Sequence, residues 1–505
     1  MPLISLKNAG EVDNLKLHLV GHEYKYAVEQ IMLMLFPDER PEYDEPDSGV
    51  SAVIKLSFGK KYAAACTRLF YGGGKFDGSS RVSREKLCDK LSTDRLLQKI
   101  IKLSFYKAAS AAIGYEPVWG ALTGIRPGKI ITQMVAQGMS ENQAERALIK
   151  EYRVSLDRAA LCSDTARAAL TVQNSLAPRD VALYIGIPFC PTRCAYCSFV
   201  SHSVEKSIKL IDPFLAALFL EIDGTAAIVQ ETGLSVVSVY IGGGTPTTLS
   251  ESQLSALIEK LSASFDLSHV REYTVEAGRP DTITPEKLSA IKKGGATRIS
   301  VNPQSMSNAV LSTIGRRHTA EDVYTAVASA QKVGFECINM DVIAGLPADS
   351  VAGFKNTLDE VLSLSPGNIT VHTLSLKKGS RIMLEKTTVP SANDVSAMLD
   401  YASETLRRAG YAPYYLYRQK FTSGGFENVG WSRPGLESFY NICMMEELCT
   451  ILALGGGGAT KFVAPGSGKI ERVFNPKYPY EYNDNIRKII ANKSAIKAFF
   501  ERNTF

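Results

Sequence analysis

Three cysteines lie close together in the segment GIPFCPTRCAYCSF, at Cys190, Cys194 and Cys197. A closed zinc site uses four ligands and disulfides use cysteines in pairs, so three neighbouring thiols need another explanation. Cysteine thiolates are the usual ligands of a [4Fe–4S] cluster, and three of them leave one iron open to a small molecule. Pro188 and Pro191 prevent the loop from winding into a helix. The spacing therefore predicts a cluster with one open coordination position.

A zinc site is the alternative for the same segment. Cys194 and Cys197 form a C-x-x-C pair, and Cys190 with His202 would complete four ligands. The loop lacks a second ligand pair, which favours the cluster. Three buried structural cysteines are less favoured still, because Pro, Thr and Arg flank them.

Further motifs with glycine or charged residues lie at or just past the apolar runs later in the chain: YIGGGTPT, TVEAGRP, RISVNPQSM, IGRRHT and NMDVIAGLP. Successive glycines let a ligand approach the backbone without interference from Cβ atoms. Each motif also has an ordinary interpretation: a turn for the glycines, a surface acid for Glu276, a solvated helix charge for Arg316 and a salt-bridge partner at the rim for Asp341.

Alternating strands and helices are expected to position these residues. From Val181 onward the apolar runs are VALYIGI, VVSVYIG, EYTVEA, RISVNPQ, INMDVIAGL and ITVHTLSL, and amphipathic segments separate them. One such helix is expected over 394–408, with a single apolar face made of Val395, Met398, Leu399, Ala402 and Leu406.

This alternation predicts right-handed βαβ units and a parallel sheet. Six units in roughly 235 residues suit an incomplete (β/α)6 barrel, because a complete eightfold barrel takes about 250. A doubly wound open sheet is the alternative. In both folds the chemistry belongs at the carboxyl ends of the strands, where the candidate residues fall.

Three domains are expected. Residues 1–176 form an α+β extension, with strands at LKLHLV and SAVIKLSF, helix between Arg84 and Ile113, and a capping box at Ser140 to Gln143. Residues 177–410 form the barrel. Residues 411–505, with YYLYRQK and the glycine-rich LGGGGAT, form a small C-terminal domain that covers the substrate.

The bulk composition is that of a soluble protein. Of 505 residues, 45% are hydrophobic and 22% charged, and the net charge of +5 favours neither nucleic acid nor an anionic membrane. No apolar run approaches the ~20 residues of a membrane span. The other six cysteines are scattered singly and no export leader opens the chain, so a reducing, cytoplasmic location is expected.

The segment LYIGIPFCPTRCAYCSF resembles the radical S-adenosylmethionine enzymes, whose signature C-x-x-x-C-x-x-C has an aromatic residue, here Tyr196, before its last cysteine. From about Val181 to Lys461 the chain is similar to the oxygen-independent coproporphyrinogen III oxidase (coproporphyrinogen dehydrogenase) family. LTGIRPGKI, at 122–130, resembles a feature of the long-form subgroup, which carries an N-terminal extension. The resemblance implies the incomplete radical-SAM barrel.

The resemblance also implies the cofactors and their ligands. Cys190, Cys194 and Cys197 would hold a [4Fe–4S] cluster and, together with Tyr184, make up the catalytic set. The residues implied to hold S-adenosylmethionine are Tyr184, Tyr196, Gly243, Gly244, Thr245, Glu276, Gln304, Arg316, Asp341 and Ser375. Gly278 stands where the family usually has Asn.

The implied activity is the oxidative decarboxylation of coproporphyrinogen III to protoporphyrinogen IX in haem biosynthesis. An electron donor such as flavodoxin or ferredoxin would supply the cluster. YRQK, at 417–420, and Arg433 are cationic residues that could bind the propionates of such a tetrapyrrole.

Two alternatives stay open, since Gly186 and Phe199 stand where members with oxidase activity have His and Cys, and CAYCSF is closer to haem chaperones. The chain would then be a haem-carrying protein, or a radical methyltransferase that opens the haem ring. The set Glu276, Gln304, Arg316 and Asp341 favours an enzyme over a carrier.

Overall fold

The computed structural model describes the following residues: 14–36, 39–43, 50–197, 202–203 (backbone), 207–376, 380–385, 387–419, 425–464 and 469–503. The chain forms two compact units, which are treated separately below. The first comprises Met1–Ser163 with Arg418–Phe426, and the second Asp164–Tyr417 with Glu427–Phe505.

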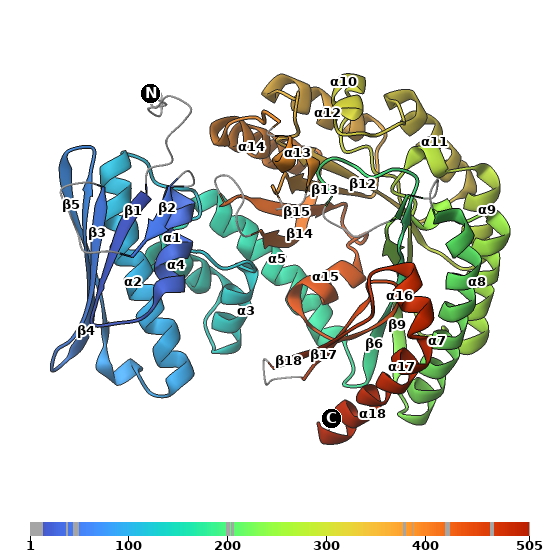
Figure 1. Cartoon of the computed structure of the whole chain (residues 1–505), viewed down its shortest axis with the longest axis horizontal. Coiled ribbons are helices and arrows are strands. Elements are labelled where there is room, and N and C mark those ends of the chain that lie inside the picture. The colour runs from blue at the N-terminus through green and yellow to red at the C-terminus, as the bar shows by residue number, and fades with distance from the viewer. Residues whose placement is uncertain are drawn as a thin grey trace. The chain divides into compact units, whose positions relative to one another are not determined.

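The first unit is built on a five-stranded sheet of order β2-β1-β3-β4-β5. Its strands are β1 (Asn14–Val20), β2 (Arg40–Glu42), β3 (Ser51–Phe58), β4 (Tyr62–Tyr71) and β5 (Gly74–Ser83). Helices α1 (Lys25–Leu35) and α2 (Lys90–Ile113) lie beside it (Figure 1). Ile31 of α1 and Phe105 of α2 share a buried apolar core with Ile54 of β3. The predicted strands at LKLHLV and SAVIKLSF are confirmed.

Three further helices follow in chain order. They are α3 (Gly128–Ala136), α4 (Glu141–Tyr152) and α5 (Leu156–Ser175), the last of which runs into the second unit. The predicted capping box is present at α4, where the Ser140 side chain accepts from the backbone N–H of Gln143 and the Gln143 side chain accepts from that of Ser140. The region from Arg84 to Ile113, expected to be one long helix or two, is a short 3-10 helix, Arg84–Lys86, followed by α2.

The second unit contains an eleven-stranded sheet of order β14-β15-β13-β12-β11-β10-β9-β6-β16-β17-β18. All six predicted runs are strands and pair in parallel: β6 (Asp180–Ile187), β9 (Ser235–Gly243), β10 (Glu272–Glu276), β11 (Arg298–Ser300), β12 (Cys337–Ala344) and β13 (Asn368–Thr373). The predicted α/β fold is confirmed. The order is linear, and β14 and β18 are its two ends within the described residues.

Strands beyond residue 411 extend this sheet at both edges. β14 (Ala412–Arg418) and β15 (Glu427–Ser432) continue it from β13, with β15 antiparallel. β16 (Thr450–Gly455) adds a seventh parallel strand beside β6, and β17 (Ala459–Val463) and β18 (Ile470–Phe474) follow antiparallel. These strands lie in the same sheet as the barrel strands, and the separate domain expected over 411–505 stays a prediction.

Helices cover one face of the sheet. In chain order they are α7 (Ile211–Glu231), α8 (Glu251–Ser264), α9 (Pro285–Lys293), α10 (Asn308–Thr313), α11 (Ala320–Val333), α12 (Val351–Ser363) and α14 (Ala392–Arg408). Figure 1 shows α7, α8, α9 and α11 side by side. The five residues predicted for the apolar face of α14 are its buried residues.

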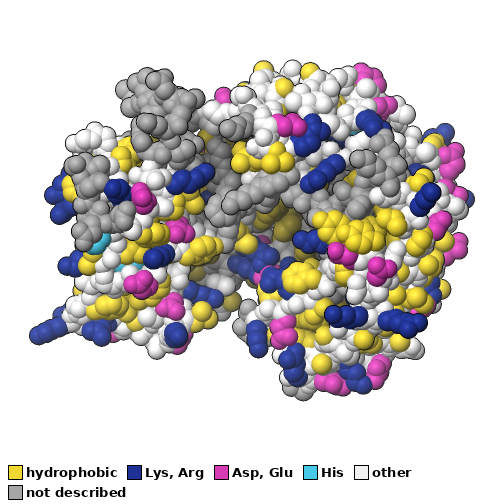
Figure 2. Space-filling model, in the orientation of Figure 1, with side chains coloured by type: hydrophobic (Ala, Val, Ile, Leu, Met, Phe, Trp, Pro, Cys, Tyr) yellow, Lys and Arg dark blue, Asp and Glu magenta, His cyan; other side chains and the backbone are white. Residues whose placement is uncertain are grey.

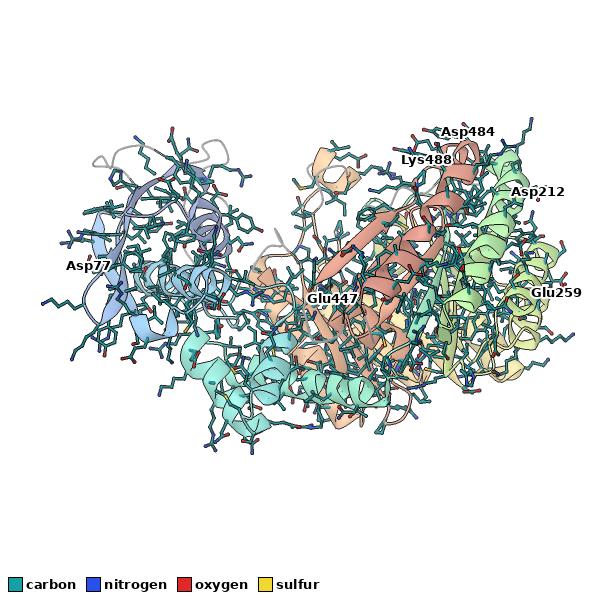
Figure 3. All side chains as sticks on the ribbon, turned by 90° about the horizontal axis from the view of Figure 1, so that it is seen from below. Asp77, Asp212, Glu259, Glu447, Asp484 and Lys488 are labelled. Carbon is teal, nitrogen blue, oxygen red and sulfur yellow. The ribbon has the colours of Figure 1, made fainter. Side chains whose placement is uncertain are left out.

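The remaining helices are α13 (Arg381–Leu384), α15 (Phe439–Glu446), α16 (Pro479–Asp484), α17 (Ile486–Asn492) and α18 (Ser494–Arg502). Charged side chains such as Asp212 of α7 and Glu259 of α8 lie on the outer helices (Figure 3). On the visible face of each unit, basic and acidic side chains are interspersed (Figure 2). Among the described residues, every helix is too short or too polar to cross a membrane.

Candidate functional site

Strand alternation gives the sheet a polar face opposite the face that the outer helices cover. On β10, for example, Tyr273 and Val275 are buried apolar residues, whereas Glu272, Thr274 and Glu276 point the other way. The same alternation puts Asn339 and Asp341 of β12, and Asn368, Thr370 and His372 of β13, on the polar face. The candidate residues lie at its carboxyl edge.

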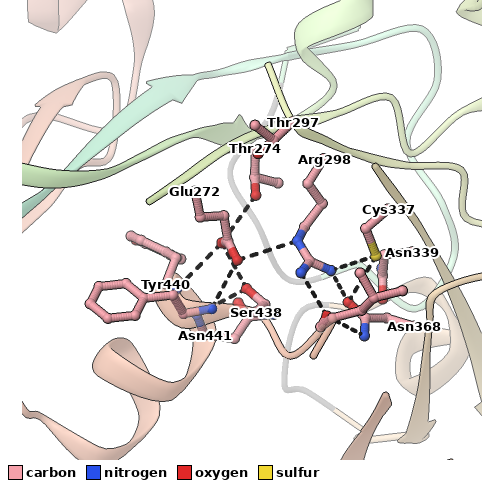
Figure 4. Close-up of polar contacts among 12 residues, drawn as sticks. Glu272, Thr274, Thr297, Arg298, Cys337, Asn339, Asn368, Ser438, Tyr440 and Asn441 are labelled. Carbon is pink, nitrogen blue, oxygen red and sulfur yellow. Dashed lines mark hydrogen bonds and ion pairs between the residues drawn. The ribbon is translucent and has the colours of Figure 1, made fainter. Parts of the chain in front are cut away.

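A buried ion pair closes the amino end of this face (Figure 4). Arg298 Nε lies 3.3 Å from a Glu272 carboxylate oxygen, and the same guanidinium donates to Asn368 and to the Leu436 carbonyl. Glu272 also accepts from the Ser438 hydroxyl at 2.9 Å and from the backbone N–H of Phe439 at 2.8 Å. Both charges are thus compensated, which a buried pair requires. The opposite, carboxyl end is left for a ligand.

The cysteine loop is held against the triglycine segment by main-chain hydrogen bonds. Cys190 ends β7 (Phe189–Cys190), directly after β6. Gly244 N–H donates to the Ile187 carbonyl at 2.8 Å, and Thr245 N–H to the Phe189 carbonyl at 2.7 Å. The Thr245 hydroxyl lies 3.6 Å from Cys190 Sγ as a donor. The two motifs therefore form one rigid edge.

The glycines allow the chain to approach itself closely. A Cβ at Gly244 would lie 2.4 Å from the Phe189 carbonyl oxygen, and one at Gly242 would lie 2.9 Å from the Glu276 carboxylate. Gly243 has a φ of +109°, which L side chains rarely adopt. The sequence argument assigned this room to a ligand, whereas at positions 242 and 244 the chain's own atoms occupy it.

Arg279 lies beside Cys194, and the sequence analysis did not single it out. Its guanidinium Nη1 is 3.6 Å from Cys194 Sγ, and Nη2 donates to the Thr192 hydroxyl at 2.9 Å. Asp281 accepts from Nε at 3.1 Å and from Nη2 at 3.2 Å. The available signal was the segment RPD, which places an arginine three residues after Glu276, where the strand ends.

Two predicted residues, Tyr196 and Arg316, are in direct contact. Arg316 Nη2 donates to the Tyr196 hydroxyl at 3.0 Å, and Nη1 donates to the Gly278 carbonyl at 2.9 Å. Burial raises the pKa of Tyr196, so the phenol is neutral. Beside Gly278, a Cβ would lie 3.2 Å from the side-chain nitrogen of Asn302, so the Asn302 amide lies close to the space that a side chain at 278 would use.

Glu276 is a buried acid with an aromatic neighbourhood. The Tyr240 hydroxyl donates to its Oε1 at 2.5 Å. Burial, reinforced by the charge of Asp341 and opposed by the Tyr240 hydrogen bond, raises the pKa of Glu276 to about 7. The predicted residue Tyr184 stacks on Tyr240 with ring centroids 6.2 Å apart, and Tyr440 stacks on Tyr240 from α15 at 4.4 Å. This stacking holds the Tyr240 ring where its hydroxyl donates to the Glu276 carboxylate.

Asp341, on strand β12, is an acid that stays ionised. Burial alone would raise its pKa, but the interaction with His372 and the hydrogen bond from Asn339 outweigh burial and hold the pKa below the usual value. Asn339 Nδ2 donates to Asp341 Oδ1 at 2.8 Å, and His372 Nε2 lies 3.7 Å from Oδ2. The Tyr417 hydroxyl lies 3.4 Å from the other ring nitrogen of His372. The sequence analysis missed His372, although it continues the polar alternation of β13.

Gln304 adopts a left-handed backbone conformation, with a φ of +69°. Its N–H donates to the Asp341 carbonyl at 2.9 Å and its carbonyl accepts from Ile343 N–H at 3.0 Å, so β12 enforces the conformation. Such strain persists only where surrounding structure imposes it, and it is common in ligand-binding sites.

Several buried polar atoms at this edge have no hydrogen-bond partner among the described residues. They are Gln304 Oε1, Ser375 Oγ and Arg316 Nε. Buried polar groups are nearly always paired in proteins, so these atoms fit a bound polar ligand. With three soft thiol donors on one loop and carboxylates beside it, this donor set fits an iron–sulfur cluster and a ligand that carries ammonium and hydroxyl groups.

Among the described residues, no three His, Cys, Asp or Glu side chains are arranged to hold one metal ion, and the zinc alternative, which needs the side chain of His202, stays a prediction. In a [4Fe–4S] cluster each thiolate binds a different iron, so the sulfurs do not meet at one point. The side chain of His202 and all of Phe199 lie outside the described part of the chain.

One of the predicted propionate-binding cations, Arg433, is not at the mouth. Arg433 follows β15 and its N–H donates to the carbonyl of Gly367, just before β13 begins, because β15 runs antiparallel to β13. It therefore lies at the amino edge, opposite the cysteines. Arg418 is buried and donates to the Leu122 carbonyl within the first unit, so its guanidinium group already has a hydrogen-bond acceptor there. Lys420 lies outside the described residues.

Comparison with known proteins identifies the chain as a radical S-adenosylmethionine protein. Residues 184–361 match the radical SAM superfamily, whose members use a [4Fe–4S] cluster and S-adenosylmethionine. The chain is 39% identical over 414 residues to the oxygen-independent coproporphyrinogen-III oxidase-like protein HemZ of Bacillus subtilis, a match that covers 81% of this chain and 83% of that protein. The chain belongs to this oxygen-independent coproporphyrinogen-III oxidase-like family of radical SAM proteins.

Other relatives have a different name. The chain is 37% identical over 195 residues to the heme chaperone HemW of Bacillus subtilis, covering 38% of this chain and 49% of that one. It is 25% identical over 327 residues to HemW of Escherichia coli, covering 64% and 82%. Among solved structures, coproporphyrinogen III oxidase (HemN) from Escherichia coli has a TM-score of 0.51 at 23% identity, over 64% of this chain and 72% of that chain, which shows a shared fold.

Proposed function

We propose that this protein is a radical S-adenosylmethionine enzyme that oxidatively decarboxylates coproporphyrinogen III to protoporphyrinogen IX. The observation that carries the proposal is the carboxyl edge of the sheet, where three cysteines lie beside buried ionisable groups and polar atoms that lack partners. An enzyme that must position a nucleotide cofactor against a substrate needs such groups.

In this proposal Cys190, Cys194 and Cys197 are the three protein ligands of the cluster. When bound, the cluster and S-adenosylmethionine together supply reductive cleavage of a carbon–sulfur bond and so a carbon radical that abstracts hydrogen. An electron donor of the flavodoxin or ferredoxin class supplies the electron. The chain's own contribution is to bind, orient and exclude water.

The acidic side chains have distinct tasks. Asp341 stays ionised and accepts hydrogen bonds from cationic or hydroxyl groups of S-adenosylmethionine. Glu276, with a pKa near neutrality, accepts from ribose hydroxyls or the methionine ammonium, and Tyr240 fixes its orientation. Gln304, Arg316, Ser375, Tyr196, Tyr184 and the Gly243–Thr245 backbone complete the set.

The reaction balances for each propionate. The β-carbon would lose one hydrogen atom to a group that S-adenosylmethionine supplies, the substrate would give one electron to an acceptor, and the carboxylate would leave as carbon dioxide. A vinyl group remains. Two such events convert coproporphyrinogen III into protoporphyrinogen IX.

Haem carriage is the second candidate, because the HemW relatives are named haem chaperones. Gly186 also supports it. A Cβ there would lie 2.7 Å from the Gly456 carbonyl oxygen, so the histidine expected of oxidase members cannot be accommodated without a shift of the backbone.

An anaerobic assay separates the candidates. Reconstituted protein is incubated with S-adenosylmethionine, a reductant and coproporphyrinogen III, and the products are read by mass spectrometry. Decarboxylation predicts vinyl products with methionine, 5′-deoxyadenosine and carbon dioxide. S-adenosylhomocysteine or linear pigments would support methyl transfer with ring opening instead, and stoichiometric haem transfer without turnover would support carriage.

A further inference from the structure

Two buried guanidinium groups flank the cysteine loop. The Arg279 side chain is 3% exposed, and its Nη1 points to Cys194 Sγ at 3.6 Å. Arg316 contacts the loop through the Tyr196 hydroxyl, at 3.0 Å. Each guanidinium group carries a positive charge. Two positively charged side chains therefore contact residues of the cysteine loop.

Around the two arginines, the described side chains carry less negative charge than the two guanidinium groups carry positive charge. Asp281 is the carboxylate that pairs with Arg279, at 3.1 Å and 3.2 Å. His318 Nδ1 lies 3.9 Å from the same carboxylate, but burial and the charge of Arg316 lower the pKa of His318 to about 4, so the imidazole is neutral. Buried charges require compensation, and the cysteine thiolates supply it when they are deprotonated by a metal cluster.

The position of Arg279 is fixed by contacts on both sides. Asp281 takes two of its N–H groups as a fork, and the hydroxyl of Thr192, in the cysteine loop itself, accepts a third contact at 2.9 Å. Because Thr192 lies between Cys190 and Cys194, the guanidinium and the thiol at Cys194 are aligned by the same loop. The geometry is that of a donor aimed at a sulfur.

We propose that Arg279, oriented by Asp281, donates a hydrogen bond to the Cys194 thiolate and raises the reduction potential of the iron–sulfur cluster. Hydrogen bonds to cluster sulfurs and nearby positive charge both favour the reduced, more negative state. Arg279 is a positioning residue that acts through the ligand, and it touches neither substrate nor reacting atoms. The inference rests on the assignment of the cluster to the three cysteines.

The test is a redox titration of the anaerobic protein without substrate or S-adenosylmethionine, followed by electron paramagnetic resonance. We expect Arg279→Gln to keep its iron and sulfide and to lower the ratio of reduced to oxidised cluster about tenfold at a fixed poise, a shift of about 59 mV for one electron. Arg279→Lys keeps the charge but loses the fork, so its shift is smaller and in the same direction.

The matched control is Arg271→Gln. Arg271 also pairs with a carboxylate, Asp180, at 3.4 Å, but it lies before β10 at the amino edge, so its loss leaves the potential unchanged. If Arg279→Gln loses iron, Arg279→Lys carries the test. If Arg279→Gln or Arg279→Lys keeps its full iron content and has the wild-type reduction potential, the proposal is overturned. Wild-type protein without any cluster would instead overturn the assignment of the cysteines.

Discussion

The Tyr240 hydroxyl and the Glu276 carboxylate share a hydrogen bond of 2.5 Å inside the sheet's polar face. This hydrogen bond links the strand before the triglycine segment to the strand that ends in Glu276. Tyr240 belongs to the strand that leads into the triglycine segment, and Glu276 ends the next strand. Since the pKa of Glu276 is about 7, the protonation of this pair changes in the neutral range.

The first prediction concerns stability against pH. Burial raises the pKa of Glu276 from 4.5 to about 7, so the folded protein favours its protonated form. Its contribution to the free energy of unfolding is therefore greatest below pH 4.5 and falls by roughly 3 kcal/mol as the pH rises through 7. Chemical denaturation of the cluster-free wild type and of Glu276→Gln, at several pH values, measures the difference. A difference that is constant across this window would contradict the assigned environment.

The second prediction concerns His372. Removing its imidazole takes away a partner that keeps Asp341 ionised, at 3.7 Å, so His372→Ala should weaken S-adenosylmethionine binding about tenfold, near the ~1.4 kcal/mol of one modest interaction. Equilibrium binding to the reconstituted protein is the measurement. His269→Ala, at an exposed histidine, is the control and should bind as the wild type does. Equal affinities for all three proteins would rule out this role.

The third prediction concerns Gly186. A methyl group there would meet the Gly456 carbonyl oxygen at 2.7 Å, so Gly186→Ala should lower the free energy of unfolding by about 1–3 kcal/mol, and Gly186→His by more. At Gly59 the equivalent contact, with the Tyr62 carbonyl, is an ordinary 3.5 Å, and Gly59→Ala should be nearly neutral. Full stability of Gly186→His would show that the site accepts the side chain.

The fourth prediction concerns the ion pair between Glu272 and Arg298. Glu272→Met leaves a buried guanidinium without its carboxylate and should cost about 3–5 kcal/mol of unfolding free energy. Adding Arg298→Met removes the uncompensated charge, so the double variant should be more stable than Glu272→Met. Denaturation of the single and double variants decides this, and additive losses would show that the pair is not coupled.

The regular parts of the fold were predictable because they depend on local periodicity. The six parallel strands show as apolar runs, and the buried face of α14 follows from a spacing of three and four residues. Pairing between distant segments left no such trace. The sequence therefore did not reveal that β16 lies beside β6, or that the antiparallel direction of β15 carries Arg433 to the amino edge.

The site was predictable in part for the same reason. Cysteine spacing locates the loop without any tertiary information, and strand ends locate Glu276 and Asp341. Arg279 and His372 were missed because their importance comes from contacts across strands, with Cys194 and Asp341 respectively. For His372 the local signal was a polar residue on a buried strand. For Arg279 it was a charged residue shortly after the end of a strand.

The central claim is that the three-cysteine loop holds a [4Fe–4S] cluster with one iron open to S-adenosylmethionine. The direct measurement is iron and sulfide content together with the electron paramagnetic resonance spectrum of reduced protein, before and after S-adenosylmethionine is added. We expect about four iron and four sulfide per chain and a spectrum that changes on addition, with both lost when all three cysteines become alanine. One zinc per chain without iron, or a cluster that survives the triple substitution, would contradict the account.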